Sequence, residues 1–164
     1  MTGPLSRPSI DVLRPRVQRS VQWVAGRSLN KAAVGMLRLG LPFPPYGPES
    51  ALVMETFGRK SGRRRLTPMG CLKVAEDRLL VVAEHGRHAD WVRNARAAGH
   101  VRIWLAGRSY QGRVRVLADG DPGAVLERMG NKVHTLSVLA MAHEPKVIEI
   151  TLDRPASEQP SDAQ

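Results

Sequence analysis

A cluster of prolines divides this chain into two stretches of different character. Four prolines fall within residues 42–48, in the segment LPFPPYGP. Proline fixes its own φ angle and lacks an amide proton, so this segment cannot continue a helix and is expected to be an extended linker. Before it, residues 14–39 carry apolar side chains at helical spacing among basic ones. After it, short apolar runs separated by turn residues are typical of β-strands.

The stretch after the linker is predicted to alternate between strands and helices. The expected strands are residues 51–57, 64–75, 79–83, 100–105, 109–117 and 146–152. Helices are expected over 90–98, over 133–143, and after Asp121-Pro122, where the aspartate serves as N-cap and the proline fits the first turn. No strand–GxGxxG–helix unit occurs, which disfavours a Rossmann domain. A sheet closed on itself would protect the edges of such short strands, so we expect an α+β domain of that kind.

The charge balance narrows the classes of partner. The 164 residues include 25 Lys and Arg against 15 Asp and Glu, a formal charge of +10, which attracts phosphorylated ligands, anionic lipid or nucleic acid. Few aromatic residues lie near the basic segments, so base stacking and a nucleic-acid partner are not expected. No run approaches the length of a membrane span. We expect a cytoplasmic protein, and the basic, partly apolar residues 14–40 leave open a peripheral contact with the inner face of the membrane.

The segment from Gly58 to Arg65 has the densest positive charge in the chain. It reads Gly58, Arg59, Lys60, Ser61, Gly62, Arg63, Arg64 and Arg65. Glycines allow tight or left-handed backbone, and backbone amides, a hydroxyl and guanidinium groups together suit a phosphate or a polycarboxylate. The alternative is a solvated hairpin turn that merely carries surface charge.

A second segment, His85–Asn94, joins an expected strand to an expected helix. Its two histidines and one aspartate within six residues suggest metal binding or acid–base chemistry. There is no HExxH pattern and no clear further ligand, so we expect no metal site. Asp90 is a candidate helix cap, and Asn94, one turn later, shares its face. The single cysteine, Cys71, excludes an internal disulfide and is expected to pack within a strand.

Two motifs in order carry a family resemblance. Met54–Met69 is similar to the T-x-G-R-K-S-G-x-x-R-x-x-P-[LM] segment of the deazaflavin-dependent nitroreductases and quinone reductases, and Ala89–Ala97 is similar to their W-x-x-N-x-x-A helix start. The resemblance covers residues 50–117 well and the last strand loosely. It implies a split β-barrel of the FMN-binding kind, with about six antiparallel strands, an N-terminal helix and one or two helices packed outside.

The resemblance also implies coenzyme F420 as reductant, with FMN as the alternative, and hydride transfer to a small-molecule acceptor of quinone, nitro or enone type. Carried over by motif, the residues that would bind the phosphate and anionic tail of the cofactor are Arg59, Lys60, Ser61 and Arg65, and those along its ring system are Thr67, Pro68 and Met69. The next loop would contribute Ala83, Glu84, His85 and Gly86, and Trp91 and Asn94 would complete the wall of the cofactor site. His85 and His134 are the candidate catalytic proton donors. Glu84 departs from the family pattern, and residues 134–141 lack the family's pocket tyrosines.

The expected organisation has four parts. Residues 1–13 are a flexible start, 14–48 a helix with the proline linker, 49–153 the cofactor-binding barrel, and 154–164 a disordered tail. Two other functions stay open from sequence. One is a carrier that binds F420 or a flavin without turnover, and the other is a basic protein of membrane surfaces or nucleic acid. No coiled-coil or other partner signal indicates an oligomeric state.

Overall fold

The computed structural model describes residues 29–153. The chain divides into two compact units, Met1–Ala32 and Ala33–Gln164, and the second is the subject here. Residues 29–38 are helical, in agreement with the second half of the expected N-terminal helix. The expectations for residues 1–13, 14–28 and 154–164 lie outside the described residues, and the domain limits at 48 and 49 stay predictions.

One antiparallel sheet organises the second unit. Its strands are β1 (Ala51–Phe57), β2 (Arg64–Gly70), β3 (Leu72–Ala75), β4 (Arg78–Ala83), β5 (Val101–Leu105), β6 (Arg108–Val116) and β7 (Lys146–Leu152). Their order across the sheet is β2-β1-β5-β6-β7-β4-β3. The expected strand over residues 64–75 proved to be two, so the sheet has seven strands instead of about six.

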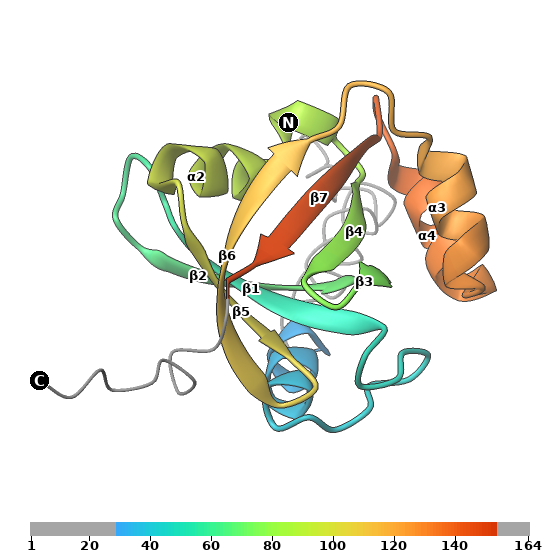
Figure 1. Ribbon diagram of the computed structural model, residues 1–164, viewed down its shortest axis with the longest axis horizontal. Helices are drawn as coiled ribbons and strands as arrows, with labels where there is room; N and C mark the ends of the chain where they lie inside the picture. The colour runs from blue at the N-terminus through green and yellow to red at the C-terminus, as the bar shows by residue number, and fades with distance from the viewer. Residues whose placement is uncertain (1–28, 154–164) are drawn as a thin grey trace, which may run out of the picture. The chain divides into compact units, whose positions relative to one another are not determined.

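The sheet curls into a split barrel because of how its two edges are joined. β2 and β3 stand at opposite ends of the strand order, yet only Cys71 separates them along the chain. A flat sheet of seven strands cannot have its two edges one residue apart, so the sheet must bend round on itself. The Cys71 amide donates to the Ser50 carbonyl at 2.9 Å, which anchors the crossing point. Figure 1 shows the resulting curvature, and the expected fold class is confirmed.

Successive side chains of β1 point to opposite faces of the sheet and so belong to two different apolar clusters. Leu52 and Met54 face the barrel interior, where they pack with inward side chains of β4, β5 and β7. Ala51 and Val53 face the other way and pack with Trp104 and the helical residue Leu37. All four β1 residues are at most 2% exposed, so the strand is buried on both faces and contributes hydrophobic stabilisation to the barrel.

Three further helices pack around the sheet. They are α2 (Asp90–Ala98), α3 (Pro122–Met129) and α4 (Lys132–Met141), and a short 3-10 turn, η2 (Gly86–His88), precedes α2. This is more than the one or two outer helices expected. In Figure 1, α2 lies on the side of the β1–β2 turn, whereas α3 and α4 lie together near β3 and β4. Among residues 29–153, no helix has both the length and the apolar character needed to cross a membrane.

Helix caps match the sequence prediction in one case and not in the other. Asp121 caps α3, because its Oδ1 accepts from the amides of Gly123 at 2.8 Å and Ala124 at 3.3 Å. Asp90 does not cap α2. The N-cap position belongs to Ala89, without a side-chain bond, and the Asp90 carboxylate instead accepts from Arg59. Asp90 is the first residue of the helix and not the residue before it, so its carboxylate does not stand at the N-cap position.

Candidate functional site

The β1–β2 turn is closed by its own backbone. The Gly58 amide donates to the Arg63 carbonyl at 2.9 Å, and the Gly62 amide donates to the Gly58 carbonyl at 2.7 Å. Gly62 has a φ of +63°, a left-handed conformation that favours glycine. The turn therefore holds its basic side chains on a defined loop.

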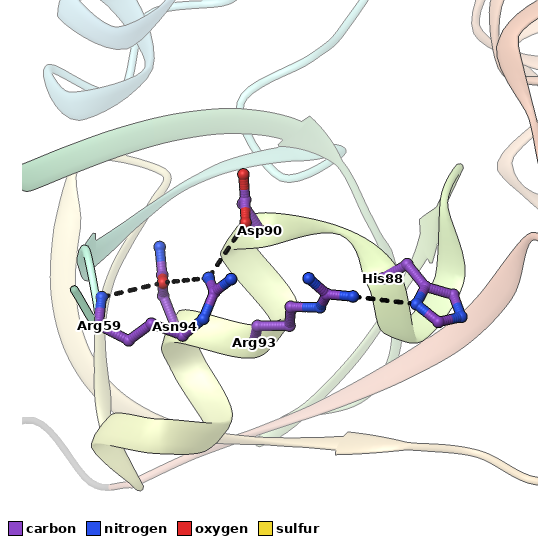
Figure 2. A network of polar contacts seen from close by, with 5 residues as sticks. All are labelled: Arg59, His88, Asp90, Arg93 and Asn94. Carbon is purple, nitrogen blue, oxygen red and sulfur yellow. Dashed lines mark hydrogen bonds and ion pairs between the residues drawn. The ribbon is translucent and has the colours of Figure 1, made fainter.

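A buried asparagine attaches this turn to α2. Asn94 is 2% exposed, and its Oδ1 accepts from the Arg59 amide at 3.2 Å and from Arg59 Nη1 at 3.1 Å. The same Nη1 donates to Asp90 Oδ1 at 3.0 Å, as Figure 2 shows. The hydrogen bond from Arg59 is the main cause that lowers the pKa of Asp90. The two motifs that carried the family resemblance are thus in direct contact.

The five cations of the turn divide into two groups. Arg59 is bound to α2, and Arg64 forms an ion pair with Glu55, a residue only 7% exposed. Lys60, Arg63 and Arg65 are exposed, and within residues 29–153 their side chains make no hydrogen bond or ion pair. Two cations of the turn therefore make contacts within the fold, and the side chains of the other three make no hydrogen bond or ion pair within residues 29–153. Arg59 and Lys60 were both predicted to bind the cofactor, and the structure gives Arg59 a positioning contact as well.

Strand β2 leads away from the turn toward the opposite side of the barrel. Thr67, Pro68 and Met69, predicted to run along the cofactor ring, lie on it and are partly buried. From Arg64 to Gly70 the strand spans roughly 20 Å at the usual rise per residue. Beside its start, Thr56 pairs in register with Arg65, and the buried Thr56 Oγ1 has no hydrogen-bond partner among the described residues.

Tyr46 and His134 meet at the far end of β2. The Tyr46 hydroxyl and His134 Nδ1 are 2.6 Å apart. Burial lowers the pKa of His134, and burial together with the Glu84 carboxylate raises the pKa of Tyr46. Both residues line a pocket of about 430 Å³. His134 was predicted as a proton donor, whereas Tyr46 was not singled out because it lies in the proline linker, 88 residues away.

The loop after β4 holds the other predicted residues. Ala83 and Gly86 are buried, Glu84 is partly buried and His85 is exposed. Burial raises the pKa of Glu84, partly offset by His85. Within residues 29–153, no hydrogen bond or ion pair joins Glu84 to the nearby Arg87.

The histidines of this loop make no metal cluster. His88 Nδ1 is 3.0 Å from Arg93 Nη2, a contact drawn in Figure 2, and His88 Nε2 is 3.9 Å from Glu144. Within residues 29–153, no group of three His, Cys, Asp or Glu side chains could hold a metal ion. Trp91 packs partly buried against the interior core, so its ring has a packing role in addition to the wall position predicted for it.

Several solved structures share part of this fold at low identity. HutZ, a heme storage protein of Vibrio cholerae, is 12% identical over 65% of this chain and 83% of its own, with a TM-score of 0.47. An F420-H2 dependent reductase, FDR-A, is 17% identical over 63% of this chain and 94% of its own, with a TM-score of 0.45. A putative 5-nitroimidazole antibiotic resistance protein of Bacteroides thetaiotaomicron is 14% identical over 65% and 74%, with a TM-score of 0.45.

These likenesses are too distant to assign a function, and no curated protein sequence matches the chain. The family assignment comes from sequence. The model of the F420H(2)-dependent quinone reductases matches residues 25–147, a range that includes both motifs, the proline linker and α4. The resemblance drawn from the two motifs is confirmed: this chain belongs to the F420H(2)-dependent quinone reductase family.

Proposed function

We propose that the protein binds reduced coenzyme F420 and transfers a hydride from it to an organic acceptor of quinone, nitro or enone type. The observation that carries this proposal is the basic turn. Three of its cations make no side-chain hydrogen bond or ion pair within residues 29–153, and the loop that presents them is attached to α2 through buried Asn94. Such a loop is organised before any ligand arrives, which lowers the entropy cost of binding.

The donor set fits the cofactor that the family implies. F420 carries a phosphate and a polyglutamate tail, so it presents several anionic groups in a row. Arg63 and Arg65 offer guanidinium groups that bind phosphate or carboxylate in a bidentate way, and Lys60 adds a mobile point charge. FMN has a single phosphate and would use only part of this charge. The number of cations therefore favours the deazaflavin.

The chain's own contribution to the reaction is binding and orientation. When bound, the cofactor supplies the hydride. The turn would hold its anionic end, and the partly buried residues Thr67, Pro68 and Met69 would support the ring along β2. Hydride transfer depends on close and correct alignment of donor and acceptor, which a rigid strand provides better than a loop.

Cofactor binding is tested by fluorescence titration of the purified chain with F420. We expect Lys60→Gln and Arg65→Gln each to weaken binding by about tenfold, equal to about 1.4 kcal/mol, because each removes a charge-assisted contact to an anion. Arg96→Gln, the same change of charge on the exposed side of α2, is the control and should leave the affinity nearly unchanged. Absence of binding at micromolar F420, or equal effects of all three variants, would contradict the proposal.

Turnover separates the reductase from a carrier. Protein loaded with reduced F420 is mixed with a quinone, a nitro compound and an enone, and the return of the oxidised cofactor's absorbance is followed. We expect reoxidation by at least one acceptor at a rate above that of free cofactor. Tight binding without any reoxidation would support the carrier, and tighter binding of FMN than of F420 would reverse the cofactor assignment.

A further inference from the structure

Three distant parts of the chain converge at the end of β2 that lies farthest from the basic turn. They are Tyr46 in the proline linker, Gly70 at the end of β2 and His134 on α4. A Cβ atom on Gly70 would lie 3.0 Å from Tyr46 Cε1 and 3.2 Å from both Cε1 and Nε2 of His134. Both rings thus press against the backbone of β2, and only glycine leaves room for them.

Backbone and cap contacts hold each ring in place. Tyr46 exchanges two backbone hydrogen bonds with Phe43, at 2.8 Å and 3.1 Å. His134 lies in the first turn of α4, where its amide donates to Asn131 Oδ1 at 3.0 Å. Asn131 Nδ2 also donates to the Pro45 carbonyl at 3.4 Å, so the helix start is tied to the linker. The Tyr46–His134 pair is therefore positioned by the fold and does not depend on a ligand.

The protonation states of the pair follow from its burial. Because burial lowers the pKa of His134 and raises that of Tyr46, the imidazole is neutral and the phenol protonated near pH 7. A neutral imidazole has one N–H. His134 Nε2 is buried without a partner among the described residues, and a proton there would be an unpaired buried donor, which is costly. A proton on Nδ1 can donate to the Tyr46 oxygen, which leaves the phenol proton available for a third atom.

The pocket beside this pair is large enough to hold a small ligand. Its volume of about 430 Å³ lies in the usual range for ligand sites. Besides Tyr46 and His134, its lining includes Ser50, Cys71 and Met129. Burial raises the pKa of the Cys71 thiol to about 12, so the pocket holds no thiolate that would add to an electrophilic quinone.

We propose that this pocket receives a quinone-type carbonyl acceptor and that the Tyr46 hydroxyl, positioned by His134, hydrogen-bonds and protonates its oxygen. The inference rests on the proposed function, because the reduced deazaflavin must supply the hydride. In the balanced step the quinone accepts the hydride, with its two electrons, at one carbonyl oxygen and a proton at the other, and becomes the hydroquinone. The O–H bond at the second oxygen forms as the Tyr46 O–H bond breaks. The phenolate accepts a hydrogen bond from His134 Nδ1–H and regains its proton from solvent.

Binding of a quinone to this pocket is tested in the absence of F420. The chain, labelled at histidine ¹³Cε1, is titrated with 2,3-dimethyl-1,4-naphthoquinone, whose reactive ring positions are blocked. We expect the His134 resonance to shift while that of exposed His100 stays in place, and Tyr46→Phe to weaken the apparent affinity about tenfold. Tyr110→Phe, the chain's other tyrosine, is the control and should bind as the natural chain does. An unmoved His134 resonance up to the solubility limit, or equal affinity of Tyr46→Phe, would overturn the assignment.

Turnover measurements test whether Tyr46 supplies the proton. With the same quinone and reduced F420, Tyr46→Phe should lower kcat at least 100-fold, the lower end of what a positioned acid supplies, and leave the dissociation constant of F420 unchanged. His134→Ala should lower kcat less, and His134→Asn, whose amide can still donate near the Nδ1 position, should recover part of the loss. If F420 fails to bind at all, the proposed function fails. If F420 binds and Tyr46→Phe turns over normally, this inference alone is refuted.

Discussion

Replacing Asn94 by alanine tests whether the two family motifs form one structural unit. The change removes the Oδ1 atom that accepts from the Arg59 amide and from Arg59 Nη1. A neutral hydrogen bond contributes about 1 kcal/mol and one to a charged group about 2 kcal/mol. Because the Arg59 side chain is 30% exposed, water replaces part of the second. We expect the free energy of unfolding to fall by about 2 kcal/mol.

Urea unfolding at 25 °C measures this loss of free energy. Repeating the change in an Arg59→Ala chain separates the contribution of the backbone hydrogen bond from that of the side-chain hydrogen bond. In an Arg59→Ala chain the side-chain hydrogen bond is already absent, so adding Asn94→Ala should cost only the backbone part, about 1 kcal/mol. Asp90→Asn touches the same guanidinium, but the Asp90 side chain is 79% exposed. Its effect should be smaller and should vanish in high salt.

If Asn94→Ala changes the free energy of unfolding by less than 0.5 kcal/mol, roughly the error of such measurements, the buried amide does not hold the turn. If the loss is the same in the natural and Arg59→Ala backgrounds, the guanidinium contact contributes nothing. A stable Asn94→Ala chain with undiminished F420 affinity would also show that the loop needs no support from α2.

Further predictions concern single sites in the barrel. Native Cys71 should resist iodoacetamide at pH 8 and react once unfolded, since its pKa in the fold is about 12 against an ordinary 9.0. Its contribution to stability is complete below pH 9 and is lost toward pH 12, so urea unfolding should show a falling stability there, by up to about 1.4 kcal/mol per pH unit, which Cys71→Ala removes. Thr56→Val should raise stability by up to about 1 kcal/mol, because it removes a buried hydroxyl without a partner in the described residues; an unchanged or lower Tm would indicate a hidden partner. Gly70→Ala should cost about 1–3 kcal/mol through crowding, whereas Gly35→Ala, on a helix with open space around it, should gain about 0.5–1 kcal/mol in the same assay.

The order of apolar and polar residues predicted the strands and helices well where residues close in sequence determine the local structure. β1, β7 and α2 begin and end where alternation or helical spacing placed them. The break at Cys71 was missed, although Pro68 and Gly70 interrupt the apolar pattern of residues 64–75. The break arises when the chain crosses from one edge of the sheet to the other, and the hydrogen bond from Cys71 to Ser50 that marks it is a tertiary contact.

The same limit applies to the candidate site, because the sequence shows which charged residues are present but not which partners they contact. The sequence indicated a cation-rich turn beside a helix start. It could not assign Arg59 and Arg64 to structural contacts, because their partners Asn94 and Glu55 are determined by the fold. Tyr46 escaped notice for a related reason: a tyrosine among prolines has no pattern of its own, and its meaning comes only from His134 on a distant helix.

The geometry of β2 links the two ends of the proposed site. Its first residues adjoin the basic turn and its last residue adjoins the Tyr46–His134 pair, so a ligand held along the strand would have its anionic end and its reacting end supported by different elements. Changes in the cations should then act mainly on cofactor affinity, and changes in Tyr46 mainly on the chemical step. The strand is paired only on its β1 side. The basic turn matches the motif of the family resemblance, whereas residues 134–141 carry no tyrosine, so this chain would differ from the tyrosine-bearing members at the acceptor end of the site and not at the cofactor end.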